Sequence, residues 1–215
     1  MSANNQSAQG GDNHINLYEP HVWKHHTKVA GLEWKNPVGT ASGTFQYAAV
    51  RWFYDVSQLG AVCTKGASPV PWEGNPSPRT AESPAANINA VGLQNPGIDH
   101  YLAEDLPKLK AAGAFVISNV AGHCDDDYAA VVEKLADSDA DMLEINVSCP
   151  NVSAGGMSVG TDPVALANLM DRLRPMTDKP MIVKLTPNVT DITVPARAAV
   201  EPVSYTHLRA HETPE

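Results

Sequence analysis

Cysteine, long apolar runs and basic residues are all scarce in this sequence. Its 215 residues include 3 cysteines, Cys63, Cys124 and Cys149, which are too few and too scattered for a disulfide framework or a paired-cysteine zinc site. No apolar run reaches the roughly 18 residues that a membrane-spanning helix needs. The polar N-terminus also lacks the apolar stretch of a signal peptide. These absences predict a cytoplasmic protein in a reduced compartment, without a membrane anchor or a metal site.

The charge balance argues against a nucleic-acid partner. Fifteen Lys and Arg residues stand against 24 Asp and Glu residues, which gives a formal net charge of −9. DNA- and RNA-binding domains usually carry a basic face, so this composition disfavours them. Hydrophobic residues make up 43% and charged residues 18% of the chain, which is typical of a soluble globular domain with a core.

Composition divides the chain into three parts. Residues 1–20 are rich in Asn, Gln, Ser and Gly, which predicts a disordered N-terminal tail. Residues 21–201 have a globular composition and form the domain proper. Within it, residues 66–97 are rich in Pro, Gly and Asn and are predicted to form one long loop, a length that is often functional. In residues 202–215 the apolar spacing stops.

Alternating strand and helix patterns point to parallel β/α units. Short apolar runs predict strands at residues 37–43, 61–65, 114–120, 142–148 and 181–185. Helical spacing follows the third and fourth runs, and Asp162 with Pro163 is predicted to start the second of these helices. A further helix is predicted over 45–56, with Trp52 and Phe53 on its apolar face. Residues 28–34 read as a small hairpin around Gly31. Parallel strands with helical crossovers define the α/β class.

The α/β pattern fits the first five units of an incomplete (β/α)8 TIM barrel. A complete barrel needs about 250 residues, and we therefore expect this chain to stop before closure. An open doubly wound sheet is the rival fold. It often carries a G-x-G-x-x-G turn after its first strand, and this sequence has none.

The segment from Asn146 to Asn151, Asn-Val-Ser-Cys-Pro-Asn, carries the strongest chemical signal. It ends a well-patterned strand, and the C-terminal ends of barrel strands face the active site. The two amides can bind a planar polar ligand, and Cys149 can act as a base if its pKa is tuned. A lone cysteine is more often a buried structural residue, but the asparagines and the Gly-rich residues 154–160 favour function.

Two lysines lie at predicted strand ends. Lys184 sits among apolar neighbours in the run 181–185, and a buried lysine is costly unless it meets an anion. Lys65 ends the run 61–65 directly before Gly66, so an exposed turn lysine is an equally good interpretation of its position. The predicted barrel would direct both side chains toward one mouth.

Six ordered segments resemble the class 1 dihydroorotate dehydrogenase family, across residues 22–200. Besides the Cys149 segment they are Ala41-Ser-Gly43, Thr64-Lys-Gly66, the loop stretches 73–79 and 87–97, Ser118-Asn-Val-Ala-Gly122 and Ile182–Asn188. The segments 92–97 and 119–122 are most similar to the NAD-linked class 1B type. The resemblance implies an FMN-binding TIM barrel that oxidises dihydroorotate to orotate in pyrimidine (UMP) biosynthesis.

The resemblance also implies a role for individual residues. Cys149 would be the catalytic base that removes the C5 proton while a hydride leaves C6 for the flavin. The implied substrate ligands are Lys65, Asn89, Asn146 and Asn151, with the backbone of Val91, Gly92 and Leu93 at the carboxylate. The implied FMN ligands are Ala41, Ser42, Gly43, Lys65, Asn119, Asn146 and Lys184.

Partners are implied by the resemblance alone. Class 1B enzymes pass electrons to NAD through a separate subunit with FAD and a 2Fe-2S cluster, around a homodimeric core in a heterotetramer. This chain has neither the cysteines for such a cluster nor a dinucleotide motif. A fumarate-linked class 1A enzyme is the alternative if no such partner exists.

Residues 202–215 have no counterpart at this point of the family pattern. They resemble translated sequencing-adapter sequence, which predicts a non-native tail on a C-terminally truncated chain. Three alternatives therefore stay open: a tRNA dihydrouridine synthase, a dihydropyrimidine dehydrogenase-like FMN barrel, and an inactive fragment. The net charge of −9 disfavours the first, and turnover of uracil against dihydroorotate separates the second.

Overall fold

The structure is a computed structural model that describes residues 26–148, 159–203 and 207–209. The predicted N-terminal tail, Cys149 and Asn151 lie outside these residues, as does most of the segment 202–215. Among the described residues, no helix has the length and apolarity that crossing a bilayer requires.

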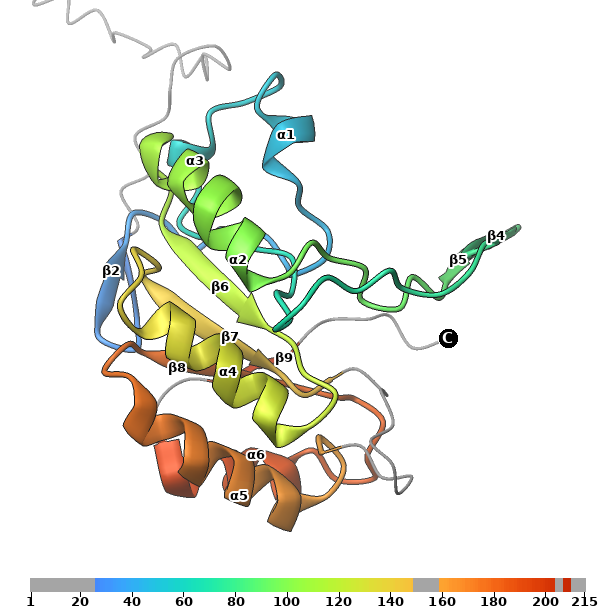
Figure 1. The fold of residues 1–215 in the computed structure, drawn as a ribbon, viewed down its shortest axis with the longest axis vertical. Coiled ribbons are helices and arrows are strands. Elements are labelled where there is room, and N and C mark those ends of the chain that lie inside the picture. Colours follow the sequence, from blue (N-terminus) through green and yellow to red (C-terminus); the bar gives the residue numbers. More distant parts are fainter. Residues whose placement is uncertain (1–25, 149–158, 204–206, 210–215) are drawn as a thin grey trace, which may run out of the picture.

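A five-stranded parallel sheet forms the centre of the molecule (Figure 1). Its order is β3-β6-β7-β8-β9. These strands are β3 (Val62–Cys63), β6 (Val116–Val120), β7 (Met142–Asn146), β8 (Met181–Leu185) and β9 (His207–Arg209). A single parallel bridge between Gly39 and Ala61 adds the segment before β3 to the same edge. The predicted parallel arrangement is confirmed, although the first expected strand is reduced to that bridge.

The last strand was not expected from the sequence. β9 pairs in parallel with β8, and its register sets Val183 opposite His207 and Leu185 opposite Arg209. Three residues without a clear alternating pattern give little local signal for a strand. The boundary at residue 202 between native and non-native sequence stays a prediction.

The helices cover one side of the sheet (Figure 1). The first runs continuously through α2 (Ile98–His100), a π-helical turn (Tyr101–Asp105) and α3 (Leu106–Ala111). It is followed by α4 (Asp125–Ala136), α5 (Pro163–Leu173) with a 3-10 turn (Arg174–Met176), and α6 (Thr193–Val203). α5 begins where its sequence predicts, because the Asp162 carboxylate accepts a 2.9 Å hydrogen bond from the Val164 amide and Pro163 follows at the first helical position.

Strand alternation divides the apolar residues into two cores. Leu143 and Ile145 of β7 pack in the large core beneath the helices. Met142, at the alternate position, belongs to a smaller cluster on the opposite, inner face. Successive side chains of a strand point to opposite faces, so Glu144 and Asn146 share the inner face with Met142. Both faces are buried, which explains the almost continuous apolar runs.

A hairpin closes the inner face at the N-terminal ends of the strands (Figure 1). It consists of β1 (Thr27–Val29) and β2 (Leu32–Trp34), as predicted, and its two turn residues both have positive φ. Trp34 is 7% exposed and belongs to the inner cluster with Ala61, Cys63, Ile117, Met142 and Ile182. Its ring also contacts Phe115, with centroids 5.7 Å apart.

The predicted helix over residues 45–56 is wrong. Only α1 (Tyr47–Val50) is α-helical, and a separate 3-10 turn follows at Val56–Gln58. The Asp55 carboxylate accepts a 2.9 Å hydrogen bond from the Ser57 amide, and this cap starts a new turn instead of continuing the first. Trp52 and Phe53 are therefore 76% and 84% exposed rather than packed.

The predicted loop over residues 66–97 contains structure of its own. β4 (Thr80–Ser83) and β5 (Ala86–Asn89) form an antiparallel hairpin that projects from the C-terminal side of the sheet (Figure 1). Every residue of both strands is exposed. Without a buried face the sequence carries no apolar alternation, so the hairpin has no local signature.

Candidate active site

The inner face changes from apolar to polar along each strand. In β7 the order is Met142, Glu144 and Asn146, and in β8 Ile182 precedes Lys184. β6 follows the same rule with Ile117 and then Asn119. The apolar members pack around Trp34 at the N-terminal end, which leaves the polar members toward the C-terminal end. Parallel β/α folds bind ligands at that end.

Lys184 of β8 contacts Ser42, in the segment that precedes β3. The Lys184 ammonium donates a 3.0 Å hydrogen bond to Oγ of Ser42, although 142 residues separate them. Ser42 stands in a tight turn in which the Thr44 amide donates to the Ala41 carbonyl at 3.3 Å and Gly43 has φ +80°. That turn follows the bridge at Gly39 and brings all three predicted flavin residues of this segment to the rim.

Asn119 is held from two directions. Its side-chain nitrogen donates a 2.5 Å hydrogen bond to the Glu144 carboxylate, and its backbone amide donates to Oγ1 of Thr64 at 3.2 Å. All three residues are buried, Asn119 at 1% and Glu144 at 4% exposure. The side-chain oxygen of Asn119 is also buried and accepts no hydrogen bond from the residues that the structure describes, which is rare for such an atom.

Cys63 lies within the same polar layer. Burial raises the pKa of its thiol well above the usual range, and a hydrogen bond to Glu144 with that carboxylate's negative charge raises it further. The positive charge of Lys184 opposes this shift. Cys63 therefore stays a neutral thiol at ordinary pH, and it does not have the low pKa of a nucleophile.

Gly66 allows the chain to pass close to Asn119. A Cβ at this position would lie 2.6 Å from the Asn119 side-chain oxygen and 3.1 Å from the Ala121 methyl group. The backbone of Gly66 is not in the left-handed region, so space rather than conformation requires glycine here. Lys65 precedes it, half-buried, two residues after the end of the short strand β3.

Asn146 ends β7 at the polar rim and is Lys184's neighbour in the sheet register. Its side-chain oxygen accepts hydrogen bonds from Oγ and the amide of Ser148, at 2.7 and 3.2 Å. Tyr128 of α4 donates a 2.8 Å hydrogen bond to its backbone carbonyl. These contacts fix the strand end from which the chain continues to Cys149.

Asn95 connects the two ends of the segment 66–97 by hydrogen bonds. Its side-chain oxygen accepts hydrogen bonds from Oγ of Ser68 at 2.8 Å and from the Gly97 amide at 2.9 Å, and its nitrogen donates to the Leu93 carbonyl at 2.8 Å. Trp72 of this loop stacks on His123, which follows β6, with ring centroids 3.8 Å apart and planes 13° from parallel. The loop is thus attached to the C-terminal side of the sheet.

The predicted substrate loop residues lie farther out. Asn89 ends β5 on the exposed hairpin, and Val91, Gly92 and Leu93 follow it half-buried. Gly92 and Leu93 both have positive φ, and the Val91 carbonyl accepts a 3.1 Å hydrogen bond from the Asn75 amide. The structure does not bring Asn89 into the polar layer of Asn119 and Glu144.

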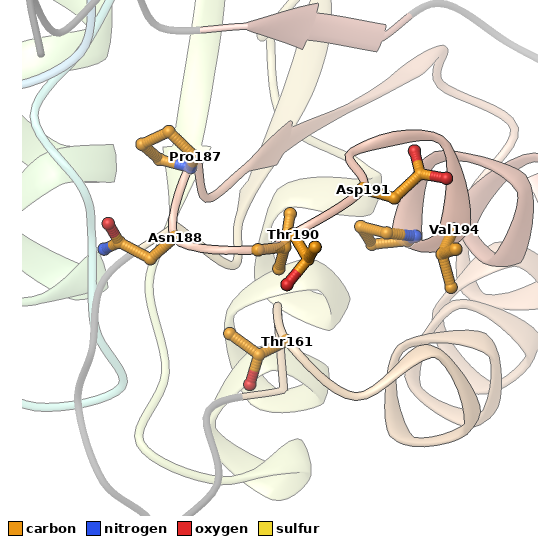
Figure 2. Close-up of a pocket in the computed structure, with 8 residues that line it drawn as sticks. Thr161, Pro187, Asn188, Thr190, Asp191 and Val194 are labelled. Carbon is orange, nitrogen blue, oxygen red and sulfur yellow. The ribbon is translucent and has the colours of Figure 1, made fainter.

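A separate hollow of about 700 Å³ opens beyond the end of β8. Figure 2 shows Thr161 below the loop that carries Asn188 and Thr190, with Asp191 and Val194 to one side. None of the predicted site residues that the structure describes lines it. Within the described ranges, no group of three or more His, Cys, Asp or Glu side chains is placed to hold a metal ion.

The structure gathers Ser42, Lys65, Asn119, Asn146 and Lys184 at the ends of adjacent inner-face strands. Two residues of this region were missed. Glu144 stands two residues before Asn146 in an apolar strand, and the period of two was signal enough to place it on the same face. Asn95 precedes Pro96-Gly97, a turn sequence that could have marked it as a structural anchor.

A curled parallel sheet, covered by helices outside and polar at its C-terminal rim inside, defines the class of parallel β/α enzymes that bind ligands at strand ends. Comparison with known proteins is more specific. The dihydroorotate dehydrogenase family model matches residues 24–208, and the chain therefore belongs to the dihydroorotate dehydrogenase family.

Three curated relatives illustrate the match. The dihydroorotate dehydrogenase B (NAD(+)) catalytic subunit of Alkaliphilus metalliredigens is 51% identical over 176 residues, covering 80% of this chain and 57% of the relative. The subunit of the same name from Lachnoclostridium phytofermentans is 49% identical over 175 residues, with the same coverage. A putative dihydroorotate dehydrogenase A (fumarate) of Aquifex aeolicus is 47% identical over 176 residues, 81% and 58% of the two chains. The chain thus spans little more than half the length of these relatives.

Proposed function

We propose that this chain forms the N-terminal part of an FMN-dependent dihydroorotate dehydrogenase, which oxidises dihydroorotate to orotate in pyrimidine biosynthesis. The observation that carries the proposal is the polar rim itself. Ser42, Asn119, Asn146 and Lys184 come from four separate segments and meet at the C-terminal side of one sheet. We infer the reaction from the names of the similar proteins, which are dihydroorotate dehydrogenase subunits. The full (β/α)8 barrel belongs to the same proposal.

The rim fits the ring system of FMN. A flavin ring offers an N–H donor and carbonyl acceptors along one edge, and Asn119 has a buried side-chain oxygen without a donor. The Lys184 ammonium is half-buried and can face negative charge on that ring. Ser42 and Lys65 would complete the contacts. When bound, FMN supplies the hydride acceptor, while the protein supplies position and electrostatics.

The proposed substrate contacts flank this rim. Asn146 lies beside Lys184 in the sheet register, and the chain runs from it to Cys149 and Asn151. Cys149 would act as the base that takes a proton from dihydroorotate, while Asn146 and Asn151 hold the ring. Asn89 and the backbone of Val91–Leu93 would reach the substrate from the loop anchored by Asn95. That loop would also exclude water from the site.

NAD is the proposed final electron acceptor. The similar catalytic subunits named for NAD(+) include the 51% identical relative, while the relative named for fumarate is 47% identical. The word "subunit" in the NAD-linked names supports a partner chain, which we propose carries FAD and a 2Fe-2S cluster. Turnover with fumarate as the sole acceptor, without any partner, would contradict this choice.

The direct test uses the 215-residue chain with FMN under anaerobic conditions. We expect dihydroorotate, and not dihydrouracil, to bleach the oxidised flavin band. A Cys149→Ala variant should bind FMN equally but lose reduction by a factor of about 10² or more, the usual contribution of a general base. Equal bleaching in both proteins would remove Cys149 from the proposed role.

A chimera tests the site residues of this chain within a chain as long as the relatives. Residues 24–201 would replace the matching segment of the Alkaliphilus metalliredigens relative, and the product would be assayed for dihydroorotate oxidation. Activity that depends on Cys149 would assign the reaction to this chain's residues even if the 215-residue chain binds FMN weakly. A folded chimera that binds FMN but does not turn over would refute the proposed function.

A further inference from the structure

Glu144 is a buried acid without an assigned role. It lies at the centre of β7, 4% exposed, with Asn119 of β6 and Ile182 of β8 as its neighbours in the sheet register. A carboxylate in such surroundings is costly unless polar partners compensate its desolvation. Among the described residues, the Asn119 amide donates a hydrogen bond to it, and the Cys63 thiol lies close enough for Glu144 to raise its pKa. The burial of Glu144 therefore indicates that this carboxylate has a role at the inner face of the sheet.

The contact with Asn119 decides which way that amide points. A primary amide can present either its oxygen or its nitrogen to a neighbour, whereas an ionised carboxylate only accepts hydrogen bonds. At 2.5 Å from the Glu144 oxygen, the nitrogen of Asn119 is the only end that fits. The Asn119 oxygen must then point away from Glu144, where it lies buried without a donor beside Gly66.

Charge at the same face is balanced between Glu144 and Lys184. Both act on the Cys63 thiol, in opposite directions, so both lie within electrostatic range of one buried atom. Removing the negative charge of Glu144 would make this layer more positive, because the Lys184 ammonium remains. A redox group held there would then become easier to reduce, because its reduced form carries more negative charge.

We infer that Glu144 is a positioning residue, which fixes the Asn119 amide with its oxygen as the acceptor for the flavin ring and balances the Lys184 charge beneath it. This inference rests on the proposed function for the identity of the ligand. It assigns Glu144 no contact with substrate or flavin. Cys63, a buried thiol whose pKa Glu144 raises, lies beside the carboxylate.

The first arm of the test needs no cofactor. In the 15N-labelled 215-residue chain, the side-chain amide protons of Asn119 are assigned by comparison with Asn119→Ala. Glu144→Gln should move these resonances, because a neutral amide replaces the charged acceptor. Asp171→Asn, at an exposed position of α5, is the matched control and should leave them unchanged. Unmoved resonances in Glu144→Gln would overturn the inference.

The second arm measures FMN affinity and the flavin reduction potential. Glu144→Gln should weaken FMN binding about tenfold, equivalent to about 1.4 kcal/mol, and shift the potential to more positive values. In the double variant Asn119→Asp/Glu144→Gln, called the exchanged pair, the amide and the carboxylate change places. This variant restores a donor–acceptor contact and a negative charge, and should recover most of the FMN affinity. If Glu144 has a purely structural role, Glu144→Gln should lower the stability of the fold without shifting the flavin reduction potential.

The outcomes separate the two proposals. If the unmodified chain does not bind FMN but Glu144→Gln moves the Asn119 resonances, the proposed cofactor fails and the geometric part of this inference holds. If FMN binds and the exchanged pair is no better than Glu144→Gln alone, the positioning role fails and the proposed function stands. Loss of folding in Glu144→Gln that the exchanged pair repairs supports the contact itself.

Discussion

The ammonium of Lys184 donates a hydrogen bond to Oγ of Ser42 at 3.0 Å, which joins the last long strand of the sheet to the turn that precedes the first. The contact crosses the inner face of the described sheet. It also keeps a positive charge at the rim, at hydrogen-bonding distance from a neutral partner that a ligand can replace.

Removal of this charge should weaken FMN binding. Lys184→Met keeps most of the apolar stem and loses the ammonium, so we expect affinity to fall by about tenfold or more, about 1.4 kcal/mol. Ser42→Ala should have a smaller effect, because the charge remains. Lys108→Met is the control, since Lys108 forms an exposed ion pair with Glu104. Fluorescence quenching of FMN measures all three, and equal affinities would contradict the placement of Lys184 at the cofactor.

Gly66 and Asn119 should show coupled stabilities. Gly66→Ala places a methyl group 2.6 Å from the Asn119 oxygen, so we expect a loss of about 1–3 kcal/mol in the free energy of unfolding. In an Asn119→Ala background the same substitution should cost less, because the nearest obstacle is gone. Urea unfolding of the four proteins gives the coupling energy. Simple additivity would mean that the two residues are not in contact in solution.

Trp34 should contribute strongly to stability and Trp52 hardly at all. Trp34→Ala opens a cavity in the inner cluster, and buried Trp→Ala changes cost about 3–5 kcal/mol. Trp52 is 76% exposed, so Trp52→Ala should change stability by less than about 0.5 kcal/mol. Trp34→Phe should cost less than Trp34→Ala, because the phenyl ring leaves a smaller cavity. The indole N–H that it removes has no hydrogen-bond partner among the described residues, so no hydrogen bond is lost.

Alkaline pH should destabilise the fold through Tyr101. Burial raises the pKa of this phenol to about 12, above its ordinary value of 10.0. Below pH 10 the phenol is neutral in both the folded and the unfolded chain. Between pH 10 and 12 the unfolded chain loses this proton first, so stability should fall by up to about 1.4 kcal/mol per pH unit.

Denaturant unfolding across this pH range measures the slope. Tyr101→Phe should remove this contribution, while Tyr54→Phe, at a 41% exposed position, should leave it in place. Ultraviolet titration should also show a late-ionising phenol that disappears in Tyr101→Phe. The structure places the Tyr101 hydroxyl oxygen 2.5 Å from Oγ of Ser118. If the Tyr101 phenol itself titrates near pH 10, it is not buried against Ser118.

Local pattern was sufficient for the strands and for much of the rim. Alternation and apolar runs located β6, β7 and β8 within one or two residues of their ends, and Asp162-Pro163 marked the start of α5. The same reasoning failed over residues 45–56, where apolar spacing predicted one helix, whereas α1 ends at Val50 and a separate 3-10 turn begins at the Asp55 cap. It also missed the β4–β5 hairpin, because an exposed strand has no buried face to create a pattern.

The sequence by itself determined the parallel β/α class, the family, and the polar strand ends that carry Asn119, Asn146 and Lys184. These properties follow from side-chain periodicity and from short motifs, which are local. Only the tertiary structure decided that Glu144 faces Asn119, that Trp34 closes the inner face, and that Lys184 reaches Ser42. Each of these depends on the register between strands and on burial by residues far away in the chain, and no local pattern encodes how distant segments pair.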